Sequence, residues 1–218
     1  MAQLFAPSAN SIARASILGF LLLLGFITWI AYRYHRSSYF TQIGLALEQP
    51  VPFSHKHHVD ALGIDCRYCH ATAEVSAFAG IPPTATCMNC HSVVWADAPM
   101  LAPVRQSWTT GHPLAWNRVH RLPDHVYFNH SIHVAKGIGC STCHGRVDQM
   151  PLMWKSASLF MQWCLDCHRN PEPSLRPPDA IYSMDWVPPP DQAQRSRELA
   201  EFYHIRREGL TNCNVCHR

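Results

Sequence analysis

Charged side chains are scarce in this 218-residue sequence, and its basic residues form no cluster. Asp, Glu, Lys and Arg together make up 15% of the chain, and the formal net charge is +3. Proteins that bind nucleic acids present a basic patch or stripe to the phosphate backbone. Because no such patch is encoded, we expect no nucleic acid among the partners.

No charge interrupts the run ASILGFLLLLGFITWIAY, which extends from Ala15 to Tyr32. Its length is close to the roughly 20 apolar residues that a helix needs to cross a bilayer. Trp29 and Tyr34 lie near its C-terminal end, where aromatic rings favour the membrane interface. The run is longer than the apolar region of a cleavable signal peptide, and no small-x-small cleavage site follows it. We therefore predict an uncleaved transmembrane anchor over residues 15–36.

No cysteine stands outside one repeated pattern. The ten cysteines form five Cys-x-x-Cys-His motifs: CRYCH at 66–70, CMNCH at 87–91, CSTCH at 140–144, CLDCH at 164–168 and CNVCH at 213–217. A disulfide framework would use varied spacings, and zinc sites need two CxxC pairs per metal without a following histidine. Cys-x-x-Cys-His is the attachment motif of c-type haem. The sequence therefore predicts five covalently attached haem c groups.

Each motif supplies two thiols and one imidazole to one haem. Thiols one helical turn apart can add to the two vinyl groups of a porphyrin, and the adjacent histidine then reaches the iron from one face. We expect covalent attachment through Cys66, Cys69, Cys87, Cys90, Cys140, Cys143, Cys164, Cys167, Cys213 and Cys216. The proximal iron ligands are then His70, His91, His144, His168 and His217. No motif ends in the lysine that marks a catalytic nitrite-reducing haem, so we expect electron transfer and no catalytic residue.

Covalent haem also indicates a compartment and a fold class. Haem c is attached on the outer side of the cytoplasmic membrane, so residues after 36 should be periplasmic and residues 1–14 cytoplasmic. Five haems on roughly 180 extramembrane residues leave far less chain per haem than a typical domain of 100 residues or more. Porphyrins must then form much of the core. We predict one transmembrane helix and a multihaem domain of short helices and irregular loops, with little or no sheet.

An internal duplication divides the extramembrane part. The string VPFSHKHHVDALGIDCRYCH at 51–70 aligns with VYFNHSIHVAKGIGCSTCH at 126–144 with a single-residue gap, and a second motif follows each. The sequence thus contains two di-haem modules, roughly 51–91 and 126–168, and a fifth motif at the end.

Each duplicated string holds two histidines three residues apart. Such residues lie on neighbouring faces of one helical turn, so they cannot occupy opposite sides of one iron but can serve two irons. His57 aligns with Ile132 and is expected to be a bystander. The predicted distal ligands of four irons are His55, His58, His130 and His133.

The distal ligand of the remaining iron is open. The unused candidates are the methionines and the histidines His112, His120, His125 and His204. We favour His120, because the Leu-Pro-Asp turn after it could fold it back over the second module. Three methionines that lie between or beside attachment motifs are the alternative: Met150, Met153 and Met161. A methionine would raise the haem potential relative to a second histidine.

The connecting segments complete the predicted organisation. Residues 92–125 are predicted to be a packed linker. The proline-rich residues 169–190 are predicted to be an extended strap along the surface or along a partner, and residues 191–210 a helix that Asp191 caps and Gly209 ends. The predicted divisions are 1–14 (tail), 15–36 (anchor), 37–125 (first module with linker), 126–190 (second module with strap) and 191–218 (helix and fifth site).

The whole chain resembles a known family. The N-terminal helix, two FxHxxHV modules, the strings CHGRVDQM and WCLDCHRNP, and a fifth CxxCH are similar to the pentahaem subunit of alternative complex III, a bacterial quinol:electron-acceptor oxidoreductase. The resemblance implies an iron–sulfur subunit, polytopic quinol-binding membrane subunits and a monohaem cytochrome as partners. It also implies that electrons from quinol oxidation pass to a periplasmic carrier or a terminal oxidase.

Three other functions fit part of the pattern. A stand-alone, membrane-anchored quinol dehydrogenase would oxidise quinol by itself and feed periplasmic reductases. A catalytic multihaem reductase would need a ligand-accessible, high-spin iron. The related subunit of a sulfate-reducer quinone reductase would be expected to carry six attachment sites, whereas this sequence has five.

Overall fold

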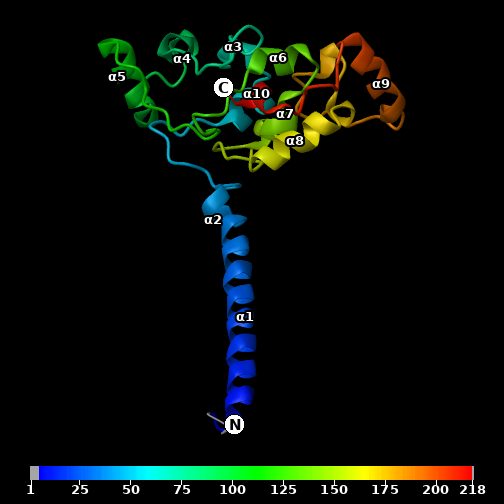
Figure 1. The fold of residues 1–218 in the computed structure, drawn as a ribbon. Helices are drawn as coiled ribbons and strands as arrows, with labels where there is room; N and C mark the ends of the chain where they lie inside the picture. Colours follow the sequence, from blue (N-terminus) through cyan, green and yellow to red (C-terminus); the bar gives the residue numbers. More distant parts are fainter. Residues whose placement is uncertain (1–4, 218) are drawn as a thin grey trace. The chain divides into compact units, whose positions relative to one another are not determined.

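The computed structural model describes residues 5–217. The chain forms two compact units, Met1–Ile43 and Gly44–Arg218, which are traced in Figure 1. Each unit is described by itself below.

Unit 1 is built on one long apolar helix. It contains α1 (Ser8–His35) and α2 (Ser38–Thr41), which ends at Gln42 in the left-handed conformation. At about 1.5 Å per residue, the 28 residues of α1 extend about 42 Å, more than the roughly 30 Å of a bilayer's hydrocarbon core. No residue of α1 is buried, and its most apolar window has a mean hydropathy of 2.1. Among residues 5–217, α1 is the one helix long and apolar enough to cross a membrane.

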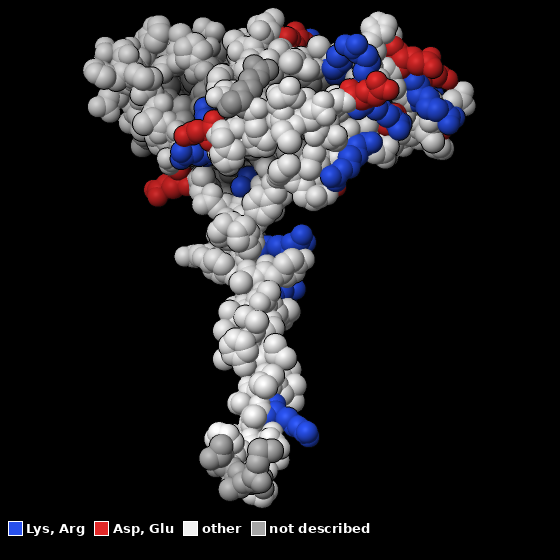
Figure 2. Space-filling model, viewed as in Figure 1, with Lys and Arg blue, Asp and Glu red and all other residues white. Residues whose placement is uncertain are grey.

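The surface of α1 supports its assignment as an anchor. Figure 2 shows an uncharged surface along most of the helix, with basic groups towards its two ends and no acidic group along it. At the C-terminal end the Arg36 guanidinium lies 4.8 Å from the centre of the Tyr32 ring. An apolar helix with this pattern is compatible with a single-pass anchor.

Unit 2 consists of short helices joined by irregular chain. In order, these are the π-helix η1 (Lys56–Ala61), α3 (Cys66–Cys69), α4 (Thr84–His91), the 3-10 helix η2 (Pro99–Leu101), α5 (Ala102–Thr110), α6 (His130–Ala135), α7 (Cys140–His144), η3 (Val147–Gln149), α8 (Met161–Arg169), η4 (Glu172–Ser174), η5 (Pro178–Ala180), α9 (Gln192–Phe202) and α10 (Cys213–Cys216). The described residues form no strand, only the isolated bridges Ala46–Trp154 and Ile138–Leu175. The predicted fold class, short helices and loops without a sheet, is confirmed.

The polypeptide builds only a small apolar core of its own. One cluster joins Val51, Leu101 and Val104, with Met88 and Trp116 packed against it. Within residues 5–217 only ten apolar side chains are buried. A domain of this length normally buries most of the surface of its unfolded chain. So sparse a polypeptide core agrees with the prediction that prosthetic groups supply much of the packing.

The segment 92–125 contains a helix that the sequence did not reveal. The 3-10 helix η2 and the α-helix α5 follow Ala98 in succession, and Gly111 ends α5 at φ 72°. The hydroxyl of Ser107 on α5 bonds Thr84 at the start of α4 (2.7 Å) and donates to the His112 carbonyl (2.6 Å). The segment is packed, as predicted, but α5 was missed because Pro, Trp and Thr hide its periodicity.

The proline-rich segment 169–190 is not the surface strap that we predicted. Leu175 is fully buried, and Arg176 is 4% exposed. The Arg176 amide donates to the Gly137 carbonyl (2.9 Å), and Leu175 pairs with Ile138 in an isolated bridge. Proline lacks an amide donor, but the residues between the prolines keep theirs. Those residues anchor the strap in the second module.

Leu175→Ala tests how firmly the strap is held. Truncating a buried leucine removes apolar contacts and leaves a cavity, which typically costs about 2–5 kcal/mol. We expect a loss of that size in the free energy of unfolding, measured on the haem-loaded chain by denaturant titration. Val187→Ala in the same strap is the control, because Val187 is 77% exposed. Equal effects of the two changes would show that the strap is not anchored at Leu175.

The C-terminal helix is shorter than predicted. α9 ends at Phe202 instead of at Gly209, because His204 adopts a left-handed conformation (φ 51°) that terminates the helix. Asp191 stands at its start, but the carboxylate accepts a bond from Arg195 Nε (2.8 Å) and does not cap the backbone. The chain after α9 is therefore irregular up to α10.

Candidate haem-binding sites

All five CxxCH motifs lie on helical turns. α3, α7 and α10 begin at the first cysteine of their motif, whereas α4 and α8 contain a whole motif. Residues three apart on a helix share a face, so the two thiols of each motif point to the same side. All ten cysteines are free thiols. Each motif thus presents the paired thiols that thioether attachment requires.

Thiols of different motifs lie close enough to influence one another. Burial raises the pKa of several cysteines, to about 11 for Cys140 and about 12 for Cys143. Neighbouring thiols add to this effect: Cys87 acts on Cys69, Cys66 on Cys140, Cys164 and Cys167 on Cys143, and Cys216 on Cys164. These interactions pair the second motif with the first, the first with the third, the third with the fourth, and the fourth with the fifth.

The aromatic rings of the two duplicated strings have the same arrangement, although the helix is a π-helix in the first string and an α-helix in the second. The Phe53 ring lies edge-on to His55 (4.9 Å between ring centres, 87°) and stacks on His58 (4.4 Å, 27°). In the second module the ring of Phe128 makes the same two contacts, at 4.7 Å and 90° with the first histidine and 4.4 Å and 30° with the second. The repeat that the sequence predicts is therefore a repeat of structure, in which one phenylalanine orients two imidazoles.

Backbone carbonyls orient the second histidine of each string. His58 Nδ1 lies 2.8 Å from the Ser54 carbonyl, and His133 Nδ1 lies 2.7 Å from the equivalent carbonyl of Asn129. An imidazole that donates its Nδ1 proton to a carbonyl keeps an unprotonated Nε2, which is the usual arrangement of a metal-binding histidine.

Most motif histidines are oriented in the same way. The Nδ1 atoms of four of them lie 2.7–3.0 Å from backbone carbonyls: His70 from Gly80, His91 from Val94, His168 from Leu210 and His217 from His125. Each therefore has its Nε2 free to bind a metal.

Three pairs of these histidines are spaced for an ion between them. The ring centres are 6.3 Å apart in His58–His91, 6.4 Å in His130–His144 and 6.1 Å in His133–His168. Imidazole nitrogens bind metal ions at about 2 Å, so rings on opposite sides of one ion have centres about 6 Å apart. In each pair the first residue comes from a duplicated string and the second from a CxxCH motif.

His55 completes this pattern on electrostatic evidence. Burial, and next the nearby His70 and His58, lower its pKa to about 4. Its Nδ1 is buried without a hydrogen-bond partner. The first histidine of each string thus neighbours the first motif of its module, and the second neighbours the second motif. Each pair of imidazole nitrogens, one from a CxxCH motif and one from a duplicated string, is a set of ligands that fits a haem iron.

Burial also favours the neutral form of the imidazoles of His144 and His133. It lowers the pKa of His144 to about 3, with further effects of His120 and His130, and it lowers the pKa of His133 as well. A neutral imidazole is the form that binds a metal.

The candidates for the fifth distal position are placed as follows. His120 contacts His144, with ring centres 4.3 Å apart at 71°, which is too close for an ion between the two. Its Nε2 is buried without a hydrogen-bond partner, and burial lowers its pKa to about 4. Met150 is 2% exposed, Met153 is half-buried and Met161 is 61% exposed.

His125 lies beside the fifth motif, but it contacts the motif histidine through its backbone and not as a distal ligand. Its ring centre is 5.6 Å from that of His217, but its carbonyl accepts the His217 Nδ1 bond. That bond puts the backbone of His125 behind the ring, away from Nε2. His125 therefore orients the motif histidine.

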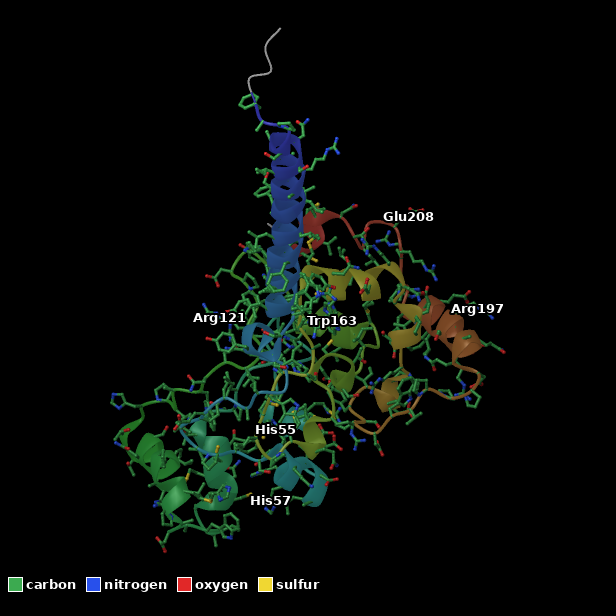
Figure 3. The ribbon with its side chains drawn as sticks, turned by 90° about the horizontal axis from the view of Figure 1, so that it is seen from below. His55, His57, Arg121, Trp163, Arg197 and Glu208 are labelled. Atoms are coloured by element: carbon green, nitrogen blue, oxygen red, sulfur yellow. The ribbon has the colours of Figure 1, made fainter. Side chains whose placement is uncertain are left out.

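His57 behaves as the sequence predicted for a bystander. It is exposed and stacks on Trp95, with ring centres 6.0 Å apart at 18°. Figure 3 labels His57, which lies on η1, and His55, which immediately precedes η1. The two neighbours differ in burial, since His55 is partly covered.

Two comparisons with known proteins bear on these motifs. Residues 126–218 match the family model of cytochrome c7 and related cytochrome c. Over 98 residues the chain is 41% identical to the protein named menaquinone reductase, multiheme cytochrome c subunit, from Nitratidesulfovibrio vulgaris. That match covers 44% of this chain and 46% of the relative, so the chain spans about half the length of the curated relative. Residues 126–218 are thus similar to cytochrome c7-like proteins, and part of the chain is similar to that multiheme cytochrome c subunit.

Proposed function

We propose that this chain is the five-haem electron-transfer subunit of a membrane quinol:acceptor oxidoreductase of the alternative complex III type. The observation that carries the proposal is the pairing of motif histidines with distal histidines at iron spacing, which leaves those irons no open position. An iron with two protein ligands exchanges electrons but does not bind substrate.

The roles of the residues follow from their positions. The ten motif cysteines hold the haems, the five motif histidines are proximal ligands, and His55, His58, His130 and His133 are distal ligands. A bound haem supplies one-electron redox chemistry. Phe53 and Phe128 orient the distal pairs. For the remaining iron, that of the fifth motif, we retain His120 or one of Met150, Met153 and Met161; the His120 ring lies against His144 of the third motif, and its Nε2 has no hydrogen-bond partner.

The order of the motifs supports an unbranched route. Neighbouring thiols link the second motif to the first, the first to the third, the third to the fourth and the fourth to the fifth. The second and fifth motifs are then the two ends. We propose that electrons enter at one of these ends and leave at the other.

The proposed setting is the cytoplasmic membrane. α1 is the single anchor, with the N-terminus inside and the haem domain on the periplasmic face. The proposed partners are an iron–sulfur subunit, polytopic quinol-binding subunits and a monohaem cytochrome, with a soluble periplasmic carrier or a terminal oxidase as acceptor. The length and apolar surface of α1 support the anchor.

A protease site inserted between residues 46 and 50 tests the anchor and its orientation. We expect protease to shorten the haem-stained band in spheroplasts, where the periplasmic face is accessible, and to leave it intact in inverted vesicles. The chain without the inserted site is the control for cleavage elsewhere. Cleavage only in inverted vesicles would reverse the proposed orientation.

One observation favours a second candidate function. The relative's name is that of a menaquinone reductase subunit, so electrons could run towards quinone instead of away from it. Purification from membranes in mild detergent separates the candidates. We expect co-purifying subunits, quinol oxidation by the complex and no quinol oxidation by the isolated chain. Oxidation by the isolated chain would make it a stand-alone dehydrogenase, and net quinone reduction by the complex would favour the second candidate.

A further inference from the structure

Arg176 is a buried cation without a carboxylate partner. The residue is 4% exposed, and among residues 5–217 none of the ion pairs includes it. Its Nε atom is buried and has no hydrogen-bond partner. A buried charge without an opposite charge is costly, so its retention at this position calls for a physical reason.

The guanidinium is held against the third CxxCH motif by neutral oxygens. Nη2 donates to the hydroxyls of Ser141 (2.8 Å) and Thr142 (3.2 Å), the two residues between the motif cysteines. Nη1 donates to the carbonyls of Ser183 (2.9 Å) and Ala180 (3.4 Å). These contacts fix the position of the charge without neutralising it.

The packing leaves no room for the charge to move. The guanidinium carbon lies 4.7 Å from the centre of the Trp186 ring, an arrangement that favours a cation. A side-chain carbon at Gly139 would also collide with the guanidinium. Gly139 immediately precedes α7, so the motif helix begins directly against Arg176.

We propose that Arg176 raises the reduction potential of the haem attached at Cys140–His144. Reduction adds one negative charge to the haem, and a fixed positive charge in a low-dielectric site stabilises that state. Arginine remains protonated even when buried, so the charge is permanent. The inference rests on the proposed function only in requiring a haem at the third motif. Arg176 does not react itself; its charge sets the electrostatic environment of that haem.

Potentiometric titration of the purified haem-loaded chain tests this inference, with haem content confirmed by intact mass. In Arg176→Gln we expect one of five optical components to shift. At a fixed potential its oxidised-to-reduced ratio should rise about tenfold, which equals a 59 mV fall for a one-electron couple. Arg176→Lys should keep most of the potential, because it keeps the charge.

Arg146→Gln is the matched control. Arg146 follows the same motif, but its side chain is 50% exposed and its charge is paired with Asp148. We expect no shift in this variant. Unchanged potentials in fully loaded Arg176→Gln, or equal shifts in the Lys and Gln variants, would overturn the proposal. The second result would mean that the hydrogen bonds, and not the charge, matter.

A second variant keeps the proposal testable if Arg176→Gln does not assemble. Gly139→Ala retains the charge but displaces the guanidinium from the motif, so it should lower the same component. An unchanged potential in fully loaded Gly139→Ala would then overturn the inference. Absence of a haem from the third motif in the unaltered chain would instead contradict the proposed function, which distinguishes the two failures.

Discussion

His58→Ala is expected to convert one of the five haem irons from low spin to high spin, whereas His57→Ala leaves all five low-spin. His58 lies near His91, with ring centres 6.3 Å apart, and its Nδ1 lies 2.8 Å from the Ser54 carbonyl, so its Nε2 is free to bind an iron that the two histidines would share. His57 is exposed and stacks on Trp95. His57→Ala is therefore the matched control for His58→Ala, because the two histidines are neighbours on one short helix.

Electron paramagnetic resonance and carbon monoxide binding measure this difference. The alanine side chain leaves the sixth position of one ferrous iron open, so about one carbon monoxide should bind per His58→Ala chain. The unaltered chain and His57→Ala should bind none. Two high-spin irons, or equal behaviour of the variants, would contradict the one-histidine, one-iron assignment.

Replacing both Cys140 and Cys143 with alanine is expected to divide the row of haems in two. Two double variants are compared, one without Cys140 and Cys143 of the third motif and one without Cys213 and Cys216 of the fifth motif. Each should lose the mass of one haem. Only the third-motif variant should stop electron exchange between the haems of the first two motifs and the haem of the fourth motif. The reason is that the thiols of the third motif interact with Cys66 of the first motif and with Cys164 and Cys167 of the fourth, so the third motif is the link between the modules in the proposed route.

Pulsed photochemical reduction measures that exchange. The control is replacement of Cys213 and Cys216, which removes an end of the row and should leave exchange among the other four haems unaffected. A circular dichroism spectrum with unchanged helix content excludes general unfolding. Persistent exchange after loss of the third haem would contradict the proposed order and require a second route.

Much of the site could be predicted from the sequence because its chemistry is local. The motif spacing alone pairs two thiols on one helical turn, and the duplicated string alone pairs two histidines on one turn. The alignment of His57 with Ile132 also singled out the residue that the structure leaves exposed. The apolar run from Ala15 to Tyr32 lies within α1.

Features that depend on distant chain segments could not be predicted. His130 Nδ1 bonds the Ala77 carbonyl, 53 residues away, and His168 bonds the Leu210 carbonyl, 42 residues away. No local pattern encodes such contacts. The burial of Leu175 was missed because prolines suggest an exposed strap, and the early end of α9 was missed because His204 carries no glycine-like signal for a left-handed turn.

The proposal that the chain carries five haems and transfers electrons is tested most directly by the intact mass and spin state of the protein purified in mild detergent. We predict a mass that exceeds the peptide by five haems, with all five irons low-spin in the oxidised protein. Four or fewer haems would contradict the assignment of a haem to every motif. A high-spin, ligand-accessible iron in the unaltered chain would contradict its role in electron transfer alone and indicate catalysis at that iron.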